Sequence, residues 1–341
     1  MSRTITPGTQ SFMRLRENNY FYIDKTEFIK NWWNAGIDVT LITRPRRFGK
    51  TLMLDTVKTF FSLECRGRSD LFESLKIWED EELRKMQGTI PVIFLSFANI
   101  KSKRYEDAIK KFKELIVGVY DEFRSQFQNI YFSITENEQI SSIRQSMENY
   151  RAQSSVHHLC KYLYRIYGIK PIVLLDEYDT PLQEAWLNGY WDKLIEFICE
   201  FFNSTFKTNP FLGRGLITGI TKIAQNSIFS DINNIEVITT TSNSYSCYFG
   251  FTENEVFAAM DEYGLTSKDE VKQWYDGFIF GQQKEIYNPW SIINFIKNNK
   301  FSPYWADTSS NALVGELFAH GDESIKRDTE TLSSNKFENI H

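Results

Sequence analysis

The sequence predicts an α/β fold in which helices cover both faces of a mostly parallel sheet, followed by a small, mainly helical region. Stretches of helical periodicity alternate with short apolar runs, an order typical of parallel sheets. The runs lie at 39–43, 91–97, 171–177 and 215–220. The third run is apolar almost throughout, as expected of a strand buried on both faces. From about Phe249 onward, short helical patterns and turns replace this alternation.

Helices are predicted where apolar residues recur at intervals of three and four. The clearest lies at 103–127, where Ile109, Phe112 and Ile116 share one side and charged residues fill the other. A helix that begins near Gly49 buries one side in the same way. Further helices are predicted at 25–35, 135–151, 155–167 and 190–206, with a helical excursion at 64–88.

The second half of the chain continues with a fifth predicted strand at 235–239. A two-stranded piece is predicted at 278–287, because β-rich residues there flank a turn. It leads to Pro289, which suits the first turn of another helix because proline lacks the N–H that such a position leaves unpaired. A last helix is predicted at 311–319.

Domain boundaries follow from the change of pattern near residue 248. We predict a sheet-containing domain at 1–248, a helical, winged-helix-like lid at 249–320, and a flexible polar tail at 321–341. Within the lid, capping boxes at Thr252–Glu255 and Ser267–Glu270 predict two helix starts.

Composition excludes several classes of protein. Of the 341 residues 42% are apolar, enough for ordinary cores, and the net charge of -5 argues against a generally basic nucleic-acid binder. The four cysteines are far apart without C-x-x-C spacing, so we predict reduced thiols in a cytoplasmic protein. No apolar run approaches the ~18 residues that a membrane span needs, and the N-terminus lacks the pattern of a signal peptide.

The stretch Leu41–Leu54 reads L-I-T-R-P-R-R-F-G-K-T-L-M-L. Its centre, Phe48–Thr51, is the second half of a phosphate-binding loop, in which backbone N–H groups surround a phosphate. Arg44 stands where the general pattern G-x-x-x-x-G-K-[ST] has its first glycine. The predicted strand before the loop and the predicted helix after it favour a phosphate site over a simple turn with an exposed lysine.

A second signal is the acidic end of the third apolar run, Asp176-Glu177. In this interpretation Lys50 binds the β- and γ-phosphates of a nucleotide, the Thr51 hydroxyl is a direct Mg²⁺ ligand, and Asp176 holds the ion indirectly, behind its direct ligands. Glu177 is the candidate general base that activates the attacking water. The order of these motifs, with another strand between them, predicts a three-layer P-loop NTPase of the class with an additional strand and a catalytic glutamate.

The remaining candidates each have an ordinary alternative. Arg46 and Arg47 either clamp phosphate, including that of a neighbouring subunit, or are solvated loop residues. Thr218 and Lys222 either sense the γ-phosphate or are a capping threonine and a surface lysine. Asp179 either supports Glu177 or only turns the chain. The predicted nucleotide-binding residues are Arg44, Pro45, Arg46, Arg47, Phe48, Gly49, Lys50, Thr51, Leu52, Thr218 and Pro289.

Together these motifs resemble the bacterial AAA-ATPase-like proteins, which often carry a C-terminal PD-(D/E)xK nuclease-like domain. The resemblance extends along most of the chain, at 22–29, 44–51, 175–182, 218–220, 227–234, 274–278 and 287–292. The family reads R-P-R-R-F-G-K in the loop, so Arg44 agrees with the family although it departs from the general pattern. The nuclease motif is not recognisable in this chain, so either that domain has been lost or the chain is an ATPase fragment, and nuclease activity is not predicted.

The loop is also similar to the G-P-R-R-x-G-K-T of the signal-transduction ATPases known as the STAND group. That likeness implies that Asp24–Phe28 contacts the adenine, and that Pro289 lies in a winged-helix lid and packs on the base. The alternative for Pro289 is an ordinary proline at the start of a helix.

Two main functions are compatible with these residues. The first is a regulatory ATPase that binds Mg-ATP, hydrolyses it slowly and closes its lid; no N-K-x-D motif for guanine is present. The second is a nucleotide-dependent scaffold with little turnover, the regulatory half of a defence or mobile-element system. A homo-oligomer or a protein partner is compatible with both. A third hypothesis, nucleic-acid binding through the loop arginines and Lys103–Arg104, is disfavoured by the net charge.

Overall fold

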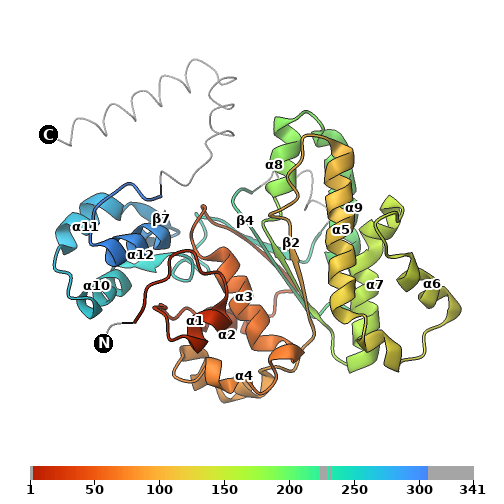
Figure 1. Ribbon diagram of the computed structural model, residues 1–341, viewed down its shortest axis with the longest axis horizontal. Helices are drawn as coiled ribbons and strands as arrows, with labels where there is room; N and C mark the ends of the chain where they lie inside the picture. The colour runs from red at the N-terminus through yellow and green to blue at the C-terminus, as the bar shows by residue number, and fades with distance from the viewer. Residues whose placement is uncertain (1–2, 223–228, 230–231, 306–341) are drawn as a thin grey trace. The chain divides into compact units, whose positions relative to one another are not determined.

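The computed structural model describes residues 3–222, 229 and 232–305. Its centre is a five-stranded sheet in the order β2-β3-β4-β1-β5 (Figure 1). Every strand pair in this sheet is parallel. The strands are β1 (Val39–Thr43), β2 (Val92–Ser96), β3 (Ile172–Asp176), β4 (Arg214–Gly219) and β5 (Ile235–Ile238). β4 lies between β1 and β3, so the predicted α/β sheet with an additional strand is confirmed.

Helices cover both faces of the sheet. One face packs against α1 (Phe12–Glu17), α2 (Glu27–Asn34), α3 (Lys50–Phe61) and α4 (Glu81–Met86), with short 3-10 turns η1 (Leu63–Cys65), η2 (Ser69–Leu71) and η3 (Lys76–Glu79) (Figure 1). The other packs against α5 (Tyr105–Phe123), α7 (Asn149–Tyr167), α8 (Thr180–Leu187) and α9 (Trp191–Phe206). η4 (Gln126–Asn129) and α6 (Ile134–Ser142) join α5 to α7.

Two apolar clusters hold these layers together. Side chains alternate along a strand, so Leu41 packs into the cluster on the α5–α9 face whereas the next residue, Ile42, packs into the cluster on the α3 face. The same alternation holds for Leu174 and Leu175 in β3. This explains why the strands read as continuous apolar runs, since both of their faces are buried.

Residues 251–304 supply most of a third cluster of buried side chains, which also includes Phe21. They comprise β6 (Phe251–Thr252), α10 (Glu253–Glu262), α11 (Lys268–Tyr275), β7 (Phe278–Phe280), β8 (Gln283–Tyr287) and α12 (Pro289–Asn298). β8 pairs antiparallel with both β6 and β7, so the predicted two-stranded piece is confirmed and gains a third strand. The chain to Tyr304 forms one compact unit, and the domain boundary at 248 stays a prediction.

Some predicted elements differ from the structure. The break between the helices predicted at 135–151 and 155–167 lies earlier, between α6 and α7, because Ile143 and Met147 turn into the core. α8 was not predicted, since its short pattern follows the acidic motif directly. At Ser267 a helix starts without a side-chain cap, so that capping box is wrong. The predicted helix at 311–319 and the tail at 321–341 lie outside the described residues.

Within the described part of the chain, the helices are too short or too polar to cross a membrane.

Candidate nucleotide-binding site

The predicted phosphate loop joins β1 to α3. β1 is buried along its whole length, and α3 starts at Lys50. Gly49 precedes the helix with φ of 79°, a left-handed conformation that glycine adopts without strain. Arg47 also has a positive φ, 67°, which costs a non-glycine residue free energy and is found mostly where the surrounding structure enforces it. The loop is therefore held in a defined, turned conformation.

Lys50 bends back over the loop that precedes it. Its Nζ donates hydrogen bonds to the carbonyl oxygens of Arg44 at 2.9 Å and Pro45 at 2.8 Å. The side chain is buried, and this burial lowers the pKa of Lys50 to about 8, although the nearby carboxylates of Asp179, Asp176 and Glu177 oppose the change. The ammonium group thus lies in a buried site whose negative charge comes from the end of β3.

Asp176 is the point at which three distant segments meet. It is the last residue of β3, and its Oδ2 accepts a hydrogen bond from Thr51 Oγ1 at 2.7 Å. Its Oδ1 accepts from Thr218 Oγ1 at 2.6 Å and from the backbone N–H of Glu177 at 3.0 Å. The parallel register explains the meeting, because the carboxyl ends of β1, β3 and β4 lie at the same edge of the sheet.

Glu177 follows with φ of 52°, again a left-handed conformation in a non-glycine residue. Its Oε2 accepts a hydrogen bond from Thr180 Oγ1 at 3.1 Å, and its carbonyl accepts from the N–H of Thr180 at 3.1 Å. The side chain is half-buried. The candidate general base is therefore held in a tight turn directly after the candidate metal ligand.

The donor set at this edge fits Mg²⁺ better than a softer metal. Thr51 and Asp176 offer a hydroxyl and a carboxylate, the oxygen ligands that Mg²⁺ prefers. Among the described residues no group of three or more His, Cys, Asp or Glu is placed to hold a metal ion. A Mg²⁺ ion here would complete its shell with phosphate oxygens and water, which is its usual arrangement with nucleotides.

The first half of the loop makes different contacts. Arg44 is fully buried, and its guanidinium lies 4.7 Å from the ring centre of Phe280 and 5.8 Å from that of Phe249. Its Nη1 donates to the carbonyl oxygen of Thr43 at 3.0 Å, whereas Nε and Nη2 have no partner among the described residues. Burial lowers the pKa of Arg44 to about 10. The side chain thus packs on aromatic rings, and only its carbonyl group contacts Lys50.

Phe48 and Arg47 also contact residues that follow 249. Phe48 is buried in a cluster with Phe278, Phe280 and Ile286. The guanidinium of Arg47 lies 4.4 Å from the ring centre of Trp290. Arg47 stays exposed, whereas Phe48 is buried. Through Phe48 in particular, the loop packs against the 251–304 segment.

Asn288 and Pro289 lie beside the loop at the start of α12. Asn288 Oδ1 accepts a hydrogen bond from the N–H of Ser291, which makes it the N-cap, and its Nδ2 lies 3.4 Å and 3.5 Å from the carbonyl oxygens of Arg46 and Arg47. Pro289 occupies the first helical turn and is buried. The predicted start of this helix is confirmed, while packing of Pro289 on a base stays a prediction.

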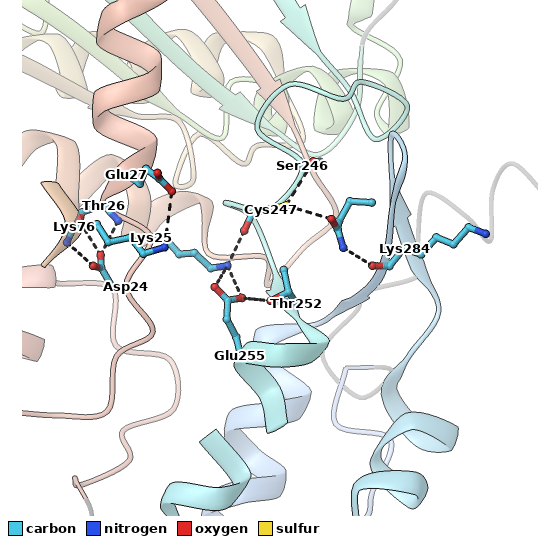
Figure 2. A network of polar contacts seen from close by, with 11 residues as sticks. Asp24, Lys25, Thr26, Glu27, Lys76, Ser246, Cys247, Thr252, Glu255 and Lys284 are labelled. Carbon is cyan, nitrogen blue, oxygen red and sulfur yellow. Dashed lines mark hydrogen bonds and ion pairs between the residues drawn. The ribbon is translucent and has the colours of Figure 1, made fainter. Parts of the chain in front are cut away.

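A separate polar network links the N-terminal segment to α10 (Figure 2). The ammonium of Lys25 lies 2.6 Å from both carboxylate oxygens of Glu255 and 2.6 Å from the carbonyl oxygen of Cys247. Glu255 Oε2 also accepts from the N–H of Thr252 at 2.7 Å, as that predicted capping box requires. Burial lowers the pKa of Lys25, and the Glu255 carboxylate partly opposes this.

The structure therefore separates the predicted residues into groups. Lys50, Thr51, Asp176, Glu177 and Thr218 come together at the carboxyl edge of the sheet. The side chains of Arg44, Arg47 and Phe48 face the 249–290 segment instead, and Leu52 packs partly into the α3-face cluster. The sequence analysis missed the contact of Asn288 with the loop and that of Lys25 with Glu255. The Asn-Pro pair at the start of a helix was the signal that could have pointed to Asn288 as a cap beside the loop.

Comparison with known proteins identifies the family of this chain. The chain is 29% identical over 321 residues to a protein of Azotobacter chroococcum mcd 1 described as "Uncharacterized protein in vnfD 5'region", covering 93% of this chain and 56% of that protein. The chain thus spans about half the length of this relative. Residues 6–229 match the family described as "Predicted AAA-ATPase". Because that match covers more than half of the sequence, the chain belongs to the family of predicted AAA-ATPases.

Proposed function

We propose that this protein binds Mg-ATP at the carboxyl edge of the main sheet and hydrolyses it slowly to ADP and phosphate, and that this cycle drives a regulatory conformational change in the cytoplasm. The observation that carries the proposal is the meeting at Asp176. Thr51, next to the buried Lys50 in the first turn of α3, and Thr218, in β4, both donate to this carboxylate at the end of β3. A turn or a structural ion pair would not require that convergence.

Each residue has a stated task in this proposal. Lys50 Nζ exchanges the carbonyl oxygens of Arg44 and Pro45 for oxygens of the β- and γ-phosphates, and the N-terminus of α3 adds favourable backbone N–H groups. Thr51 and Asp176 hold Mg²⁺, which neutralises charge on the phosphates. Glu177 accepts a proton from water, whose oxygen bonds to the γ-phosphorus as the bond to ADP breaks.

The regulatory step rests on the contacts of Arg44, Arg47 and Phe48. Because these side chains pack on Phe280, Trp290 and their neighbours, a change in the loop on nucleotide binding requires the 249–290 segment to move or repack. The predicted role of this segment as a lid follows from that coupling. A second copy or a protein partner that supplied an arginine would raise the rate by ~10³–10⁵.

The test compares phosphate release and nucleotide affinity in the wild type, Lys50→Ala and Glu177→Gln. We expect Glu177→Gln to bind ATP while its turnover falls by about 10²–10⁴-fold, the usual contribution of a general base. We expect Lys50→Ala to lose binding. Glu200→Gln and Lys193→Ala change exposed residues of α9 and serve as matched controls. Equal turnover in the wild type and Lys50→Ala would contradict the ATPase proposal.

The second candidate is a nucleotide-dependent scaffold with little turnover. It is favoured by the internal pairing of Glu177 with Thr180 and of Lys50 with its own loop, which makes both groups less available for chemistry. Hydrogen exchange at residues 278–290, measured with and without ATP, separates the candidates when combined with phosphate release. Nucleotide-dependent protection without turnover supports the scaffold, whereas protection that is lost as phosphate is released supports the ATPase switch.

A further inference from the structure

Asp179 is a fully buried carboxylate to which the proposed mechanism gives no chemical step. It lies two residues after Glu177, and its Oδ2 accepts hydrogen bonds from the N–H groups of Ile220 at 3.0 Å and Thr221 at 2.8 Å. The same oxygen accepts from Thr221 Oγ1 and from Gln183 Nε2, both at 2.8 Å. Its bonds therefore run from the turn after β3 to the segment after β4.

Tyr178 makes the same connection from the neighbouring position. Its N–H donates to the carbonyl oxygen of Thr218 at 3.0 Å, and its hydroxyl donates to the carbonyl oxygen of Thr221 at 2.8 Å. Because Thr218 also donates to Asp176, the whole turn from Asp176 to Asp179 is fastened to the end of β4. This matters for Glu177, whose φ of 52° needs the surrounding structure to maintain it.

Gly219 provides the space for this connection. A Cβ atom at Gly219 would lie 2.5 Å from Tyr178 Cε1 and 2.8 Å from Asp179 Oδ1. Contacts that short do not occur, so any larger residue would push the Tyr178 and Asp179 side chains away from β4. Asp179 Oδ1 itself has no hydrogen-bond partner among the described residues. Oδ2 thus accepts the hydrogen bonds from Ile220 and Thr221, whereas Oδ1 lies against the side of Gly219 where other residues carry a Cβ atom.

We propose that Asp179 is a positioning residue: it fastens the turn that carries Glu177 to Ile220 and Thr221, so that the end of β4 sets the position of the general base. This inference rests on the proposed ATPase function and extends it. A movement at Ile220–Thr221 would then change turnover without changing the residues that hold the nucleotide.

Because Oδ1 has no hydrogen-bond partner among the described residues, substitutions can test the role of Oδ2 separately. In Asp179→Asn the amide oxygen takes the place of Oδ2 and keeps its donors, while the NH₂ group takes the place of the unpartnered oxygen. Asp179→Ala removes the acceptor altogether. Gly219→Ala keeps the carboxylate but displaces it, since Gly219 has no positive φ and only the space matters.

We expect Asp179→Ala and Gly219→Ala to lower kcat for ATP hydrolysis by up to about 10²-fold, as misplacement of a catalytic group does. Nucleotide affinity should be kept in Gly219→Ala, which retains the carboxylate near Lys50, whereas both Asp179 variants lose that negative charge. Asp179→Asn should restore most of the rate. In Asp179→Ala the amides of Ile220 and Thr221 should exchange faster with solvent, and in Asp179→Asn they should stay protected.

Two results would overturn this inference but leave the ATPase proposal standing. In the first, Asp179→Ala hydrolyses ATP as fast as the wild type. In the second, Asp179→Asn is as impaired as Asp179→Ala in both nucleotide affinity and rate. The second result would indicate a general structural role. Wild-type phosphate release no faster than that of Lys50→Ala would overturn the ATPase proposal, and this inference with it.

Discussion

The two halves of the predicted phosphate loop differ in what they contact. Lys50 and Thr51, in the second half, face carboxylates at the end of β3, and their contacts are hydrogen bonds and charge interactions. Arg44 and Phe48, in the first half, pack on aromatic rings from the segment that follows residue 248. Both halves hold a buried cation, yet only that of Lys50 has acidic neighbours that favour its charged form.

This difference would allow one loop both to bind a nucleotide and to pass on the effect of binding to the segment after residue 248, as proposed above. The polar half has the groups that a phosphate and Mg²⁺ need, and its geometry is set by the neighbouring strands. The apolar half offers a surface to α12 and the small sheet, so its packing depends on their position. The predictions below separate the two contributions.

The largest expected effect comes from Phe48→Ala. Removing the ring from its cluster with Phe278, Phe280 and Ile286 leaves a cavity, and we expect the free energy of unfolding to fall by about 3–5 kcal/mol. Denaturant unfolding measures this. Phe295→Ala in the other C-terminal cluster is the matched control, with a similar loss of stability but unchanged nucleotide affinity. Equal nucleotide affinities in Phe48→Ala and Phe295→Ala would show that the apolar half of the loop does not contribute to nucleotide binding.

Next is Glu255→Gln, which leaves the buried Lys25 ammonium without an acidic partner. We expect a loss of about 3 kcal/mol at neutral pH. Burial already lowers the pKa of Lys25, and losing Glu255 lowers it further. Between this lowered pKa and the ordinary lysine pKa, the unfolded Glu255→Gln chain binds more protons than the folded one, so the stability of the variant rises with pH. The loss of stability relative to the wild type should therefore become smaller as the pH rises toward the ordinary lysine pKa.

Unfolding measured from neutral to alkaline pH checks this sign. The double variant Lys25→Met with Glu255→Gln is the control, because without the lysine the extra pH dependence should disappear. A loss of stability in Glu255→Gln that stays constant with pH would show that the loss does not come from the Lys25–Glu255 ion pair.

A smaller effect is expected from Thr218→Val, an isosteric change that removes the hydrogen bond to Asp176 Oδ1. Loss of a hydrogen bond to a charged group should cost about 2 kcal/mol of stability. Thr51→Val removes the matching bond to Oδ2 and should cost a similar amount. Only Thr51→Val should also abolish the Mg²⁺ dependence of nucleotide binding, measured by titration; the same loss in both variants would leave Thr51 without its special role.

The smallest effect is expected from Arg44→Met. Methionine keeps the packing on Phe249 and Phe280 but removes a buried charge that lacks an acidic partner, so stability should change by less than about 1 kcal/mol. Because only the carbonyl of Arg44 contacts Lys50, nucleotide affinity should stay within about threefold of the wild type. A large loss of affinity would show that the guanidinium leaves its rings to bind phosphate.

The polar half of the site could be predicted from the sequence because its signals are local. The tripeptide Gly49-Lys50-Thr51 follows an apolar run, and Asp176-Glu177 ends another. Parallel strands align their carboxyl ends, so a correct order of strands brings these residues to one edge without further information. The double-sided burial of the strands was equally visible, since both faces had to be apolar.

The apolar half and the connecting networks were decided only by the tertiary structure. Arg44 meets Phe249 and Phe280, and Lys25 meets Glu255, across more than two hundred residues of chain. An arginine in a loop gives no local sign of whether it will face phosphate or an aromatic ring, because both stabilise a cation. The sequence alone was enough to predict the parallel sheet of the additional-strand class, the phosphate loop and the acidic residues opposite it, because these depend on periodicity and on chain direction. The tertiary structure decided which side of the loop each cation faces, because that choice depends on which distant side chains fill the remaining space.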